Sequence, residues 1–244
     1  MQNATTHATV DVVIPAYNEE RSLPRVLAAL PARVRRVVVA DNNSTDATAR
    51  VAREGGAEVV PAPRQGYGSA CLAGLDHLRR TGPPDLVVFV DADYSDHPEE
   101  LPRLIEPLET GAADLVIGSR VLGQREKGAL LPQARAGNLL AVWMIRVLYG
   151  HRYTDLGPFR AIRWPALELL AMQDPDFGWT AEMQVKALRS GLRVVDVPVS
   201  YRKRVGQSKI TGTVRGTVLA GYKIITTILR YGLLPQRPAG ESKR

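Results

Sequence analysis

Short apolar runs ending in polar turns alternate along the chain with segments of helical spacing. Runs of this length, bounded by turn residues, are typical of buried strands in a parallel sheet. Strands are predicted at residues 10–14, 36–40, 59–60, 86–90, 115–118 and 193–199. Helices are predicted at residues 22–30, 46–53, 69–80, 136–148 and 179–190, with another after residue 97. This alternation predicts an α/β fold with a single, mostly parallel, twisted sheet flanked by helices.

The pattern changes after residue 120. Residues 121–135 are rich in Gly, Gln and charge and predict a loop, whereas residues 155–162 predict a turn that leads into a strand. No repeat, low-complexity segment or linker divides the chain. We therefore expect one catalytic domain over residues 1–213, a C-terminal helix over residues 214–234 and a flexible tail over residues 235–244.

The apolar residues of the predicted C-terminal helix are interrupted by two cations, Lys223 and Arg230. A membrane-spanning helix needs about 20 predominantly apolar residues, so these charges argue against a span. An amphipathic helix in a lipid headgroup region is predicted instead, with Tyr222, Lys223, Arg230 and Tyr231 at the wet boundary. A helix packed on the protein's own core, or on a second copy, is the alternative.

The balance of charge favours an anionic partner. The chain of 244 residues has a formal net charge of +7, which leaves phosphorylated substrates, anionic lipid and nucleic acid open. Many of the basic residues cluster late in the chain: Arg202, Lys203, Arg204, Lys209, Arg215, Lys223 and Arg230. Cys71, as a single cysteine, fits a reducing compartment, and the polar residues 1–9 lack the apolar core of a signal peptide. We therefore expect a cytoplasmic location.

Carboxylates follow several of the predicted strands. Asp91 and Asp93 come directly after the apolar run at residues 86–90, and Glu19 and Asp41 follow two earlier strands. The carboxyl ends of parallel strands share the edge of a sheet where ligands bind. Two carboxylates on a turn suit a divalent cation that keeps open positions for phosphate oxygens. A polar turn capped by aspartates is the alternative, but the combination predicts a nucleotide site, in which Asp41 is a candidate reader of the base or ribose.

The motifs in these strand ends resemble those of the family 2 glycosyltransferases, which have the GT-A fold. The matching segments are Val13–Glu20, Asp41–Asp46, Gly66–Gly68 and Asp91–Asp93. Within that family the chain is most similar to the dolichyl- or polyprenyl-phosphate hexose synthases. This narrower resemblance is carried by Gly118–Arg120, Asp155–Arg160, Glu182 with Lys186, and Val197–Val199 with the basic residues that follow. The resemblance covers about residues 10–230.

The resemblance implies a role for each matching residue. Binding of the donor's nucleoside and phosphates is implied for Pro15, Tyr17, Glu19, Asp41, Asp91, Arg160, Arg204 and Lys209. Catalysis near the reacting phosphate and sugar is implied for Asp93, Arg120, Asp155, Glu182 and Arg202. Asp91 and Asp93 would hold Mg²⁺ or Mn²⁺ against the diphosphate, and the arginines would bind phosphate. If the acceptor were a hydroxyl, Asp155 or Glu182 would act as base; a turn cap and a solvated helix carboxylate are the alternatives.

The activity implied is an inverting, metal-dependent transfer of a hexose from a nucleotide sugar, of the UDP-glucose or GDP-mannose type, to a polyprenyl phosphate. The enzyme would associate peripherally with the inner face of the membrane. The alternative keeps this donor chemistry with a soluble small-molecule or glycan acceptor, and a nucleotidyltransferase also stays open. Nucleic acid is not expected as a partner, because the grouped carboxylates repel its phosphates. No G-x-G-x-x-G follows the first strand, so a Rossmann oxidoreductase is disfavoured.

Three positions depart from the family's usual motifs. Asn42 stands where a second aspartate is common, so recognition of the base or ribose is left open. The run Tyr94–Pro98 is one residue longer than usual, which leaves Asp96, His97 or neither as a third metal ligand. Gly157–Pro158 replaces a usual Ser–Gly pair, which leaves the acceptor's identity open. The sequence does not choose the sugar, the base or the oligomeric state, a homo-oligomer included.

Overall fold

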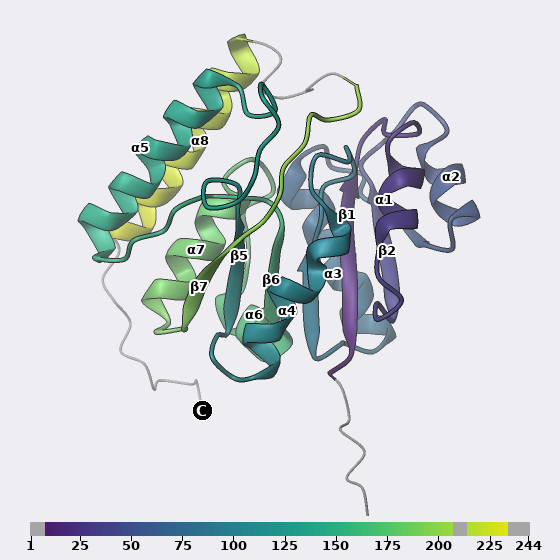
Figure 1. The fold of residues 1–244 in the computed structure, drawn as a ribbon, viewed down its shortest axis with the longest axis horizontal. Coiled ribbons are helices and arrows are strands. Elements are labelled where there is room, and N and C mark those ends of the chain that lie inside the picture. Colours follow the sequence, from purple (N-terminus) through teal and green to yellow (C-terminus); the bar gives the residue numbers. More distant parts are fainter. Residues whose placement is uncertain (1–7, 207–213, 234–244) are drawn as a thin grey trace, which may run out of the picture.

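The computed structural model describes residues 8–206 and 214–233 of the chain (Figure 1). Within these residues it forms a mixed sheet of seven strands in the order β3-β2-β1-β4-β6-β5-β7. The strands are β1 Val10–Ala16, β2 Arg36–Asp41, β3 Glu58–Pro61, β4 Leu86–Phe89, β5 Leu115–Ser119, β6 Arg160–Arg163 and β7 Val194–Pro198. The helices are α1 Leu23–Ala29, α2 Thr48–Glu54, α3 Tyr67–Thr81, α4 Leu101–Glu109, α5 Pro132–Tyr149, α6 Trp164–Leu170, α7 Trp179–Arg189 and α8 Val214–Leu233, with a 3-10 turn, η1, at Pro98–Glu100.

Most neighbouring strands are parallel, as the sequence predicts. Strand β1 pairs in parallel with β2 and β4, β2 with β3, and β5 with β7. Strand β6 is the exception, because it lies between β4 and β5 and is antiparallel to both. The carboxyl ends of β1, β2 and β4 therefore meet at one edge, while β5 and β7 end at the same level beyond the antiparallel strand.

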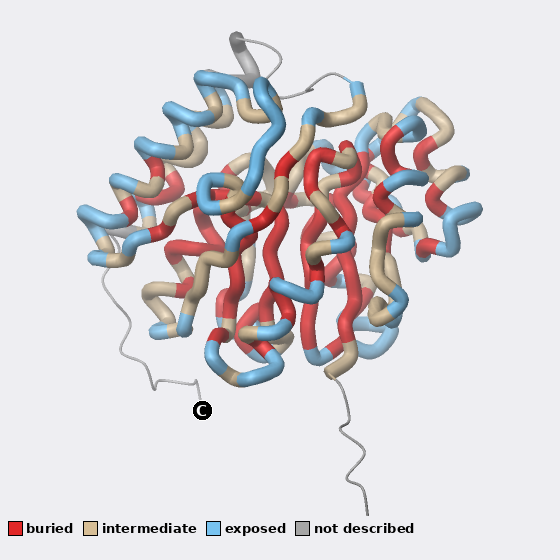
Figure 2. The backbone as a smooth tube through the Cα atoms, in the orientation of Figure 1, coloured by how far each residue is buried: buried red, intermediate tan, exposed pale blue. Residues whose placement is uncertain are grey.

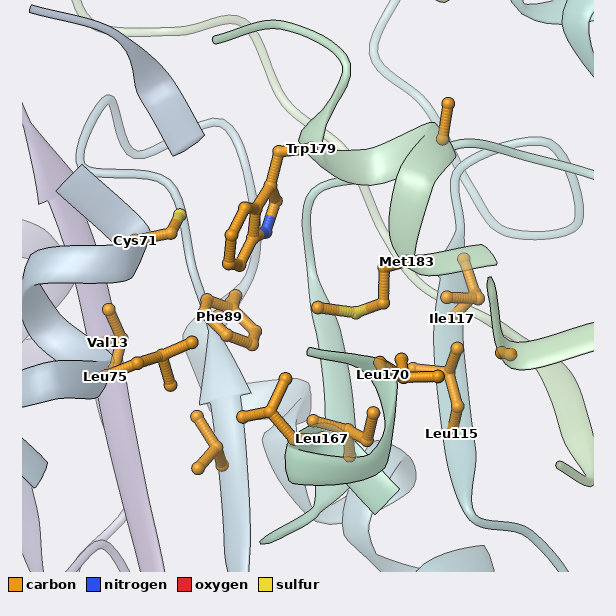
Figure 3. Close-up of a cluster of buried hydrophobic side chains, with 14 of the residues drawn as sticks. Val13, Cys71, Leu75, Phe89, Leu115, Ile117, Leu167, Leu170, Trp179 and Met183 are labelled. Atoms are coloured by element: carbon orange, nitrogen blue, oxygen red, sulfur yellow. The ribbon is translucent and has the colours of Figure 1, made fainter. Parts of the chain in front are cut away.

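Apolar side chains from alternate strand positions form a core on each face of the sheet. Val12 and Ile14 of β1 pack with α1, α2 and α4, whereas Val13 packs on the other face with α3, α6 and α7. Figure 2 shows the strands β1, β4 and β5 as buried along their length. On the second face the ring of Phe89 meets that of Trp179 edge-on, with centroids 5.9 Å apart (Figure 3). This contact ties β4, the strand that leads to the aspartates, to the start of α7.

The main differences from the sequence prediction are an earlier start of α5 and an additional helix, α6. Helix α5 begins at Pro132, inside the segment predicted as a loop, because proline is well suited to the first turn of a helix. Helix α6 is not predicted at all, and it also has a proline, Pro165, in its first turn. Just before α2, Asp46 Oδ1 accepts a hydrogen bond of 2.9 Å from the backbone of Thr48.

Helix α8 packs on the protein's own domain, beside α5 and against α7 (Figure 1). Ile228 is fully buried in this contact. Two residues expected at a lipid boundary instead face the domain: Lys223 pairs with Asp174 at 3.2 Å, and the hydroxyl of Tyr231 donates to Glu182 at 2.9 Å. The expectation is therefore wrong for these two residues, whereas the opposite face of α8 is exposed. Over the part of the chain that is described, no helix is long and apolar enough to span a membrane.

Candidate functional site

A cavity of about 430 Å³ opens at the carboxyl ends of β1, β2 and β4. Five residues predicted from the sequence to bind the donor or a metal line this cavity: Pro15, Tyr17, Glu19, Asp91 and Asp93. The other lining residues are Ala16, Asn42, Gln65, Gly66, Tyr67, Ala70, Ala92, Asp176 and Phe177. The structure thus brings together side chains from strand ends that are distant in the sequence.

Asp41 is not among the lining residues, although it ends strand β2. Its Oδ1 accepts a hydrogen bond of 3.2 Å from the backbone of Ser44, within the turn. The neighbouring Asn42 lines the cavity instead and connects three segments. Its amide nitrogen donates to the carbonyls of Ala62 and Arg64 at 2.8 and 2.7 Å, and its Oδ1 accepts from the backbone of Gly66 at 2.8 Å. A carboxylate could not donate to those carbonyls, which gives a physical reason for asparagine at this position.

The aspartates after β4 form a compact carboxylate cluster. The Oδ1 atoms of Asp91 and Asp96 are both buried without a hydrogen-bond partner in the described structure. Asp93 is better satisfied, because its Oδ1 accepts from the backbone of Ser95 at 2.9 Å and its Oδ2 pairs with Arg204 at 3.0 Å. Tyr94, between them, adopts a φ of 61°. The turn thus holds several acidic oxygens near one another, with Arg204 paired to Asp93 and Arg120 close enough to favour the charged forms of Asp91 and Asp96.

Burial and mutual repulsion change the proton affinity of this cluster. Burial of the carboxylate, and next the charge of Asp93, raise the pKa of Asp91 to about 7. Burial also raises the pKa of Asp96 well above its usual range, with Asp91 and Asp93 adding to the effect. The neutral form of each carboxyl is favoured, because the charged form would be buried away from water and next to other negative charges. A bound divalent cation would compensate those charges.

These carboxylates fit Mg²⁺ or Mn²⁺ only if oxygen atoms of the substrate supply the remaining ligands of the metal ion. Among residues 8–206 and 214–233, no group of three or more His, Cys, Asp or Glu side chains is placed to hold a metal ion. Magnesium, however, is often bound by one or two carboxylates together with substrate phosphates. The unpartnered Oδ1 of Asp91 and the carboxylate of Asp93 supply such a pair. His97 pairs with Glu99 at 2.9 Å, which leaves Asp96 as the better placed third candidate.

Arg120 and Asp155 form a buried pair beyond the end of β5. Asp155 accepts hydrogen bonds from the side chain of Arg120 at 2.8 and 2.7 Å and from its backbone at 2.8 Å. The guanidinium of Arg120 also lies 5.1 Å from the ring centroid of Tyr201. Asp155 is fully buried and directs its carboxylate at Arg120. Its position suits an orienting role, and not that of a base that must reach a substrate.

The segment after β7 runs along the aspartate turn. The backbone of Arg202 donates to the carbonyl of Ser95 at 2.9 Å, and that of Val205 donates to the carbonyl of Asp93 at 2.9 Å. The Arg202 side chain stacks 3.8 Å from the ring centroid of Tyr94. Together with the ion pair of Arg204, this geometry brings the predicted late arginines to the carboxylates. Lys209, predicted with them, lies outside the described residues.

Arg160 and Glu182 lie away from the cavity lining, although the sequence motifs included both. The guanidinium of Arg160 is fully buried and donates to the carbonyls of Leu156, Gly157 and Thr180. It therefore holds the turn before β6 to the start of α7. Glu182 is also fully buried, and it accepts hydrogen bonds from backbone and side-chain donors of other elements. Neither side chain is placed to touch a donor in the cavity.

One wall of the cavity was missed by sequence reasoning. Asp176 and Phe177 line it from the loop between α6 and α7, a segment without a recognised motif. The carbonyls of Asp176 and Pro175 accept from the backbones of Gly68 and Ser69 at 3.2 and 2.7 Å. A Cβ atom on Gly68 would collide with this loop, so Gly66-Tyr67-Gly68 allows the loop to approach α3. The glycines were the one available sign of a close backbone contact.

A second cavity, of about 360 Å³, lies between the loop after β5 and the start of α5. Its lining is mainly apolar, with two arginines: Val121, Arg125, Leu130, Pro132, Arg135, Ala136, Asn138, Leu139, Val142 and Thr154. Asn138 connects this second cavity to the segment that carries Asp155. Its Oδ1 accepts a hydrogen bond of 2.9 Å from the backbone of Leu156, the residue after Asp155. An apolar cavity with cationic groups thus adjoins the Arg120–Asp155 pair.

Comparisons with known proteins agree with this geometry. A family model described as glycosyl transferase family 2 matches residues 11–168. An uncharacterised glycosyltransferase of Mycobacterium bovis is 45% identical over 213 residues, which cover 86% of this chain and 94% of that protein. An undecaprenyl-phosphate mannosyltransferase of Micrococcus luteus is 32% identical over 238 residues, covering 91% of this chain and 93% of that protein.

A solved structure matches the fold. Glucosyl-3-phosphoglycerate synthase from Mycobacterium tuberculosis, in complex with Mn²⁺, UDP-glucose and phosphoglyceric acid, matches with a TM-score of 0.74 at 24% identity. The match covers 93% of this chain and 81% of that chain. It confirms the predicted GT-A fold.

Proposed function

Because the chain belongs to glycosyltransferase family 2, we propose that it transfers a hexose from a nucleotide sugar to a polyprenyl phosphate, with inversion at the sugar carbon. The donor would be of the UDP-glucose or GDP-mannose type. The observation that carries the choice of acceptor is the engagement of both candidate bases, Asp155 and Glu182, in buried contacts with the protein's own donors.

The donor is assigned to the cavity at the strand ends. Pro15, Tyr17 and Glu19 would surround the nucleoside, and Asp91 and Asp93 would hold Mg²⁺ or Mn²⁺. Such an ion neutralises negative charge on the departing diphosphate when it is bound. The Mn²⁺ and UDP-glucose in the solved structural neighbour support this assignment.

The acceptor is assigned to the region beside the aspartate end of the cavity, where the segment with Arg202 and Arg204 runs along the turn of Asp93. A phosphate monoester is already anionic at neutral pH, so it needs alignment and charge compensation more than a general base. Asp155 binds Nε and Nη2 of Arg120 through two hydrogen bonds, which fix the orientation of the guanidinium. Its remaining N–H groups are then preorganised to bind a phosphate. Arg202 and Arg204 lie on the adjacent segment. A hydroxyl acceptor would instead require a base with an accessible oxygen, which neither Asp155 nor Glu182 offers.

The exposed side of α5 supports a lipid-linked acceptor. Leu139, Trp143 and Val147 follow one another at spacings of four residues and are 69%, 57% and 62% exposed. Figure 2 shows this side of α5 as largely exposed. Neither α5 nor α8 contains an acidic residue, whereas Arg146 and Arg230 are exposed on them. An apolar stripe beside cations suits an anionic lipid surface, so we assign the pair of helices to the inner face of the membrane.

The test is a transfer assay with separate acceptors. The full chain is incubated with UDP-glucose or GDP-mannose, Mn²⁺ and polyprenyl phosphate in mixed micelles, and lipid-linked hexose is measured by mass spectrometry. We expect two products, a polyprenyl-phosphate hexose and a nucleoside diphosphate. Neither product should form in excess chelator. Transfer to 3-phosphoglycerate but not to polyprenyl phosphate would favour the soluble acceptor. Formation of a nucleotide sugar and pyrophosphate in a separate incubation with a nucleoside triphosphate and a hexose 1-phosphate would indicate a nucleotidyltransferase.

A further inference from the structure

The wall of the donor cavity that carries Asp176 and Phe177 belongs to residues 171–178, here called the donor-wall loop, between α6 and α7. On one side this loop contacts the first turn of α3 through the backbones of Gly68 and Ser69. Through these contacts, α3 holds the donor-wall loop on the side that faces the sheet. A loop of this length needs further support to keep two side chains in fixed positions, and the C-terminal helix supplies it.

Helix α8 meets the donor-wall loop with side chains spaced four residues apart. Lys223 Nζ lies 3.2 Å from Asp174 Oδ2 and 3.9 Å from Asp176 Oδ2. One helical turn later, the buried Thr227 abuts Gly178, where an added Cβ atom would collide with the Thr227 hydroxyl and with Asp174. The loop therefore has a cation from α8 on its carboxylates and a side chain from α8 against its end.

The next residue of the same stripe, Tyr231, reaches the carboxylate that holds the loop's backbone. Tyr231 donates to Glu182 Oε1 at 2.9 Å. Glu182 also accepts from the backbone of Gln173 at 3.0 Å and from that of Asp174 at 2.7 Å. Lys186 lies one turn further along α7, and its Nζ is 2.6 Å from Glu182 Oε1. Glu182 is thus shared between the start of the donor-wall loop and the C-terminal helix.

We propose that Lys223 and Tyr231 are positioning residues for the donor, so that nucleotide affinity depends on the docking of α8 against the donor-wall loop. This inference rests on the proposed function, because it takes the adjoining cavity as the donor site. The two contacts act on the same part of this short loop: Lys223 on the carboxylates of Asp174 and Asp176, and Tyr231 on the Glu182 carboxylate, which accepts from the backbones of Gln173 and Asp174. One face of α8 is thus exposed for a lipid surface while the other supports the donor site.

The test compares nucleotide binding in the Lys223→Met/Tyr231→Phe double variant and in the parent chain. Dissociation constants for UDP and for GDP are measured by titration calorimetry with Mn²⁺ present. Amide hydrogen exchange of residues 171–178 is measured without nucleotide. Tyr222→Phe, at an exposed position of the same helix, is the matched control, and Lys223→Arg tests whether a cation alone restores the contact.

We expect the double variant to bind the nucleotide about fivefold to tenfold more weakly, in the lower range of ordinary coupling between sites. Its donor-wall loop should exchange faster, and kcat at saturating donor should change little while KM for the donor rises. Tyr222→Phe and Lys223→Arg should bind as the parent does. Equal dissociation constants in the parent and the double variant would overturn the inference alone. A parent that binds neither nucleotide would overturn the proposed function, and the donor part of the inference with it.

Discussion

Replacing Glu182 by glutamine separates a supporting role from a catalytic one. Glu182 is fully buried and accepts from two backbone amides, the Tyr231 hydroxyl and the Lys186 ammonium. The glutamine side chain keeps one acceptor oxygen and turns an NH₂ group toward donors. A hydrogen bond to a charged group contributes about 1.5–3 kcal/mol, and breaking a buried ion pair costs about 3–5 kcal/mol. Because Lys186 keeps a bond of 2.7 Å to the Ala171 carbonyl, we expect the lower end, about 3 kcal/mol.

The assay is thermal unfolding of the full chain, followed by circular dichroism and calorimetry. For a chain of this size, 1 kcal/mol lowers Tm by about 2–4 °C, so Glu182→Gln should lower it by about 6–12 °C. Glu54→Gln is the matched control, because Glu54 pairs with Arg50 at 2.7 Å on an exposed helix surface. Exposed pairs of this kind contribute about 0.3–0.5 kcal/mol, so the control should melt within about 2 °C of the parent.

The outcome also decides what Glu182 does in the reaction. If Glu182 supports the donor-wall loop, the variant should lose stability and donor affinity together, and its remaining activity should reach near-parental kcat at saturating donor below the melting range. A variant that melts with the parent but has lost nearly all turnover would refute this reasoning. Glu182 would then have to act on the substrate, as a base does.

Three further outcomes are expected. Asp93→Asn should abolish most transfer while changing Tm little, because the diphosphate loses charge compensation; parental activity in this variant or in excess chelator would contradict the metal assignment. Arg202→Ala should lower kcat/KM by about 10- to 100-fold, the equivalent of one charge-assisted hydrogen bond of about 1.5–3 kcal/mol, whereas Arg50→Ala should leave it unchanged; equal kinetics would remove Arg202 from phosphate binding. Leu139→Ser/Trp143→Ser should weaken cosedimentation with anionic liposomes, and binding by the parent should fall with salt; equal sedimentation of the two proteins would argue against α5 as the lipid-facing helix.

The parallel part of the sheet could be predicted from the sequence because its strands are continuous apolar runs that end in turns. The sequence predicts β6 only as a strand that follows the turn at residues 155–162, and it does not predict helix α6. Helix α6 begins at Trp164, directly after β6 ends at Arg163, so no turn residues separate the two elements. The position of β6 between β4 and β5 is fixed by pairing with strands far away in the chain, and no local pattern carries that information.

The part of the cavity that strand ends form was likewise predictable, because Pro15, Tyr17, Glu19, Asp91 and Asp93 lie at or directly after strand ends. The wall with Asp176 and Phe177 was not, because it belongs to a loop without a recognised motif. The roles of Asp155 and Glu182 were not, since a carboxylate's role depends on what surrounds it after folding. Tyr231, which completes the shell of Glu182, is 49 residues away in the sequence. The apolar pattern of α8 predicted an amphipathic helix, but it could not say whether Lys223 would meet a headgroup or an aspartate of the same chain.

The placement of β6 between β4 and β5 also sets an order of assembly as the chain leaves the ribosome. In the described sheet, strands β1 to β4 form a contiguous parallel unit, whereas β5 lies between β6 and β7, both of which are made later. Until residues 160–163 appear, the free edges of β4 and β5 are open to wrong pairing. Arg120 follows β5, and Arg202 follows β7. The half of the sheet that leads to Pro15, Tyr17 and Asp91 can therefore fold first, whereas the donor-wall loop and the late arginines join it once nearly the whole chain has been synthesised.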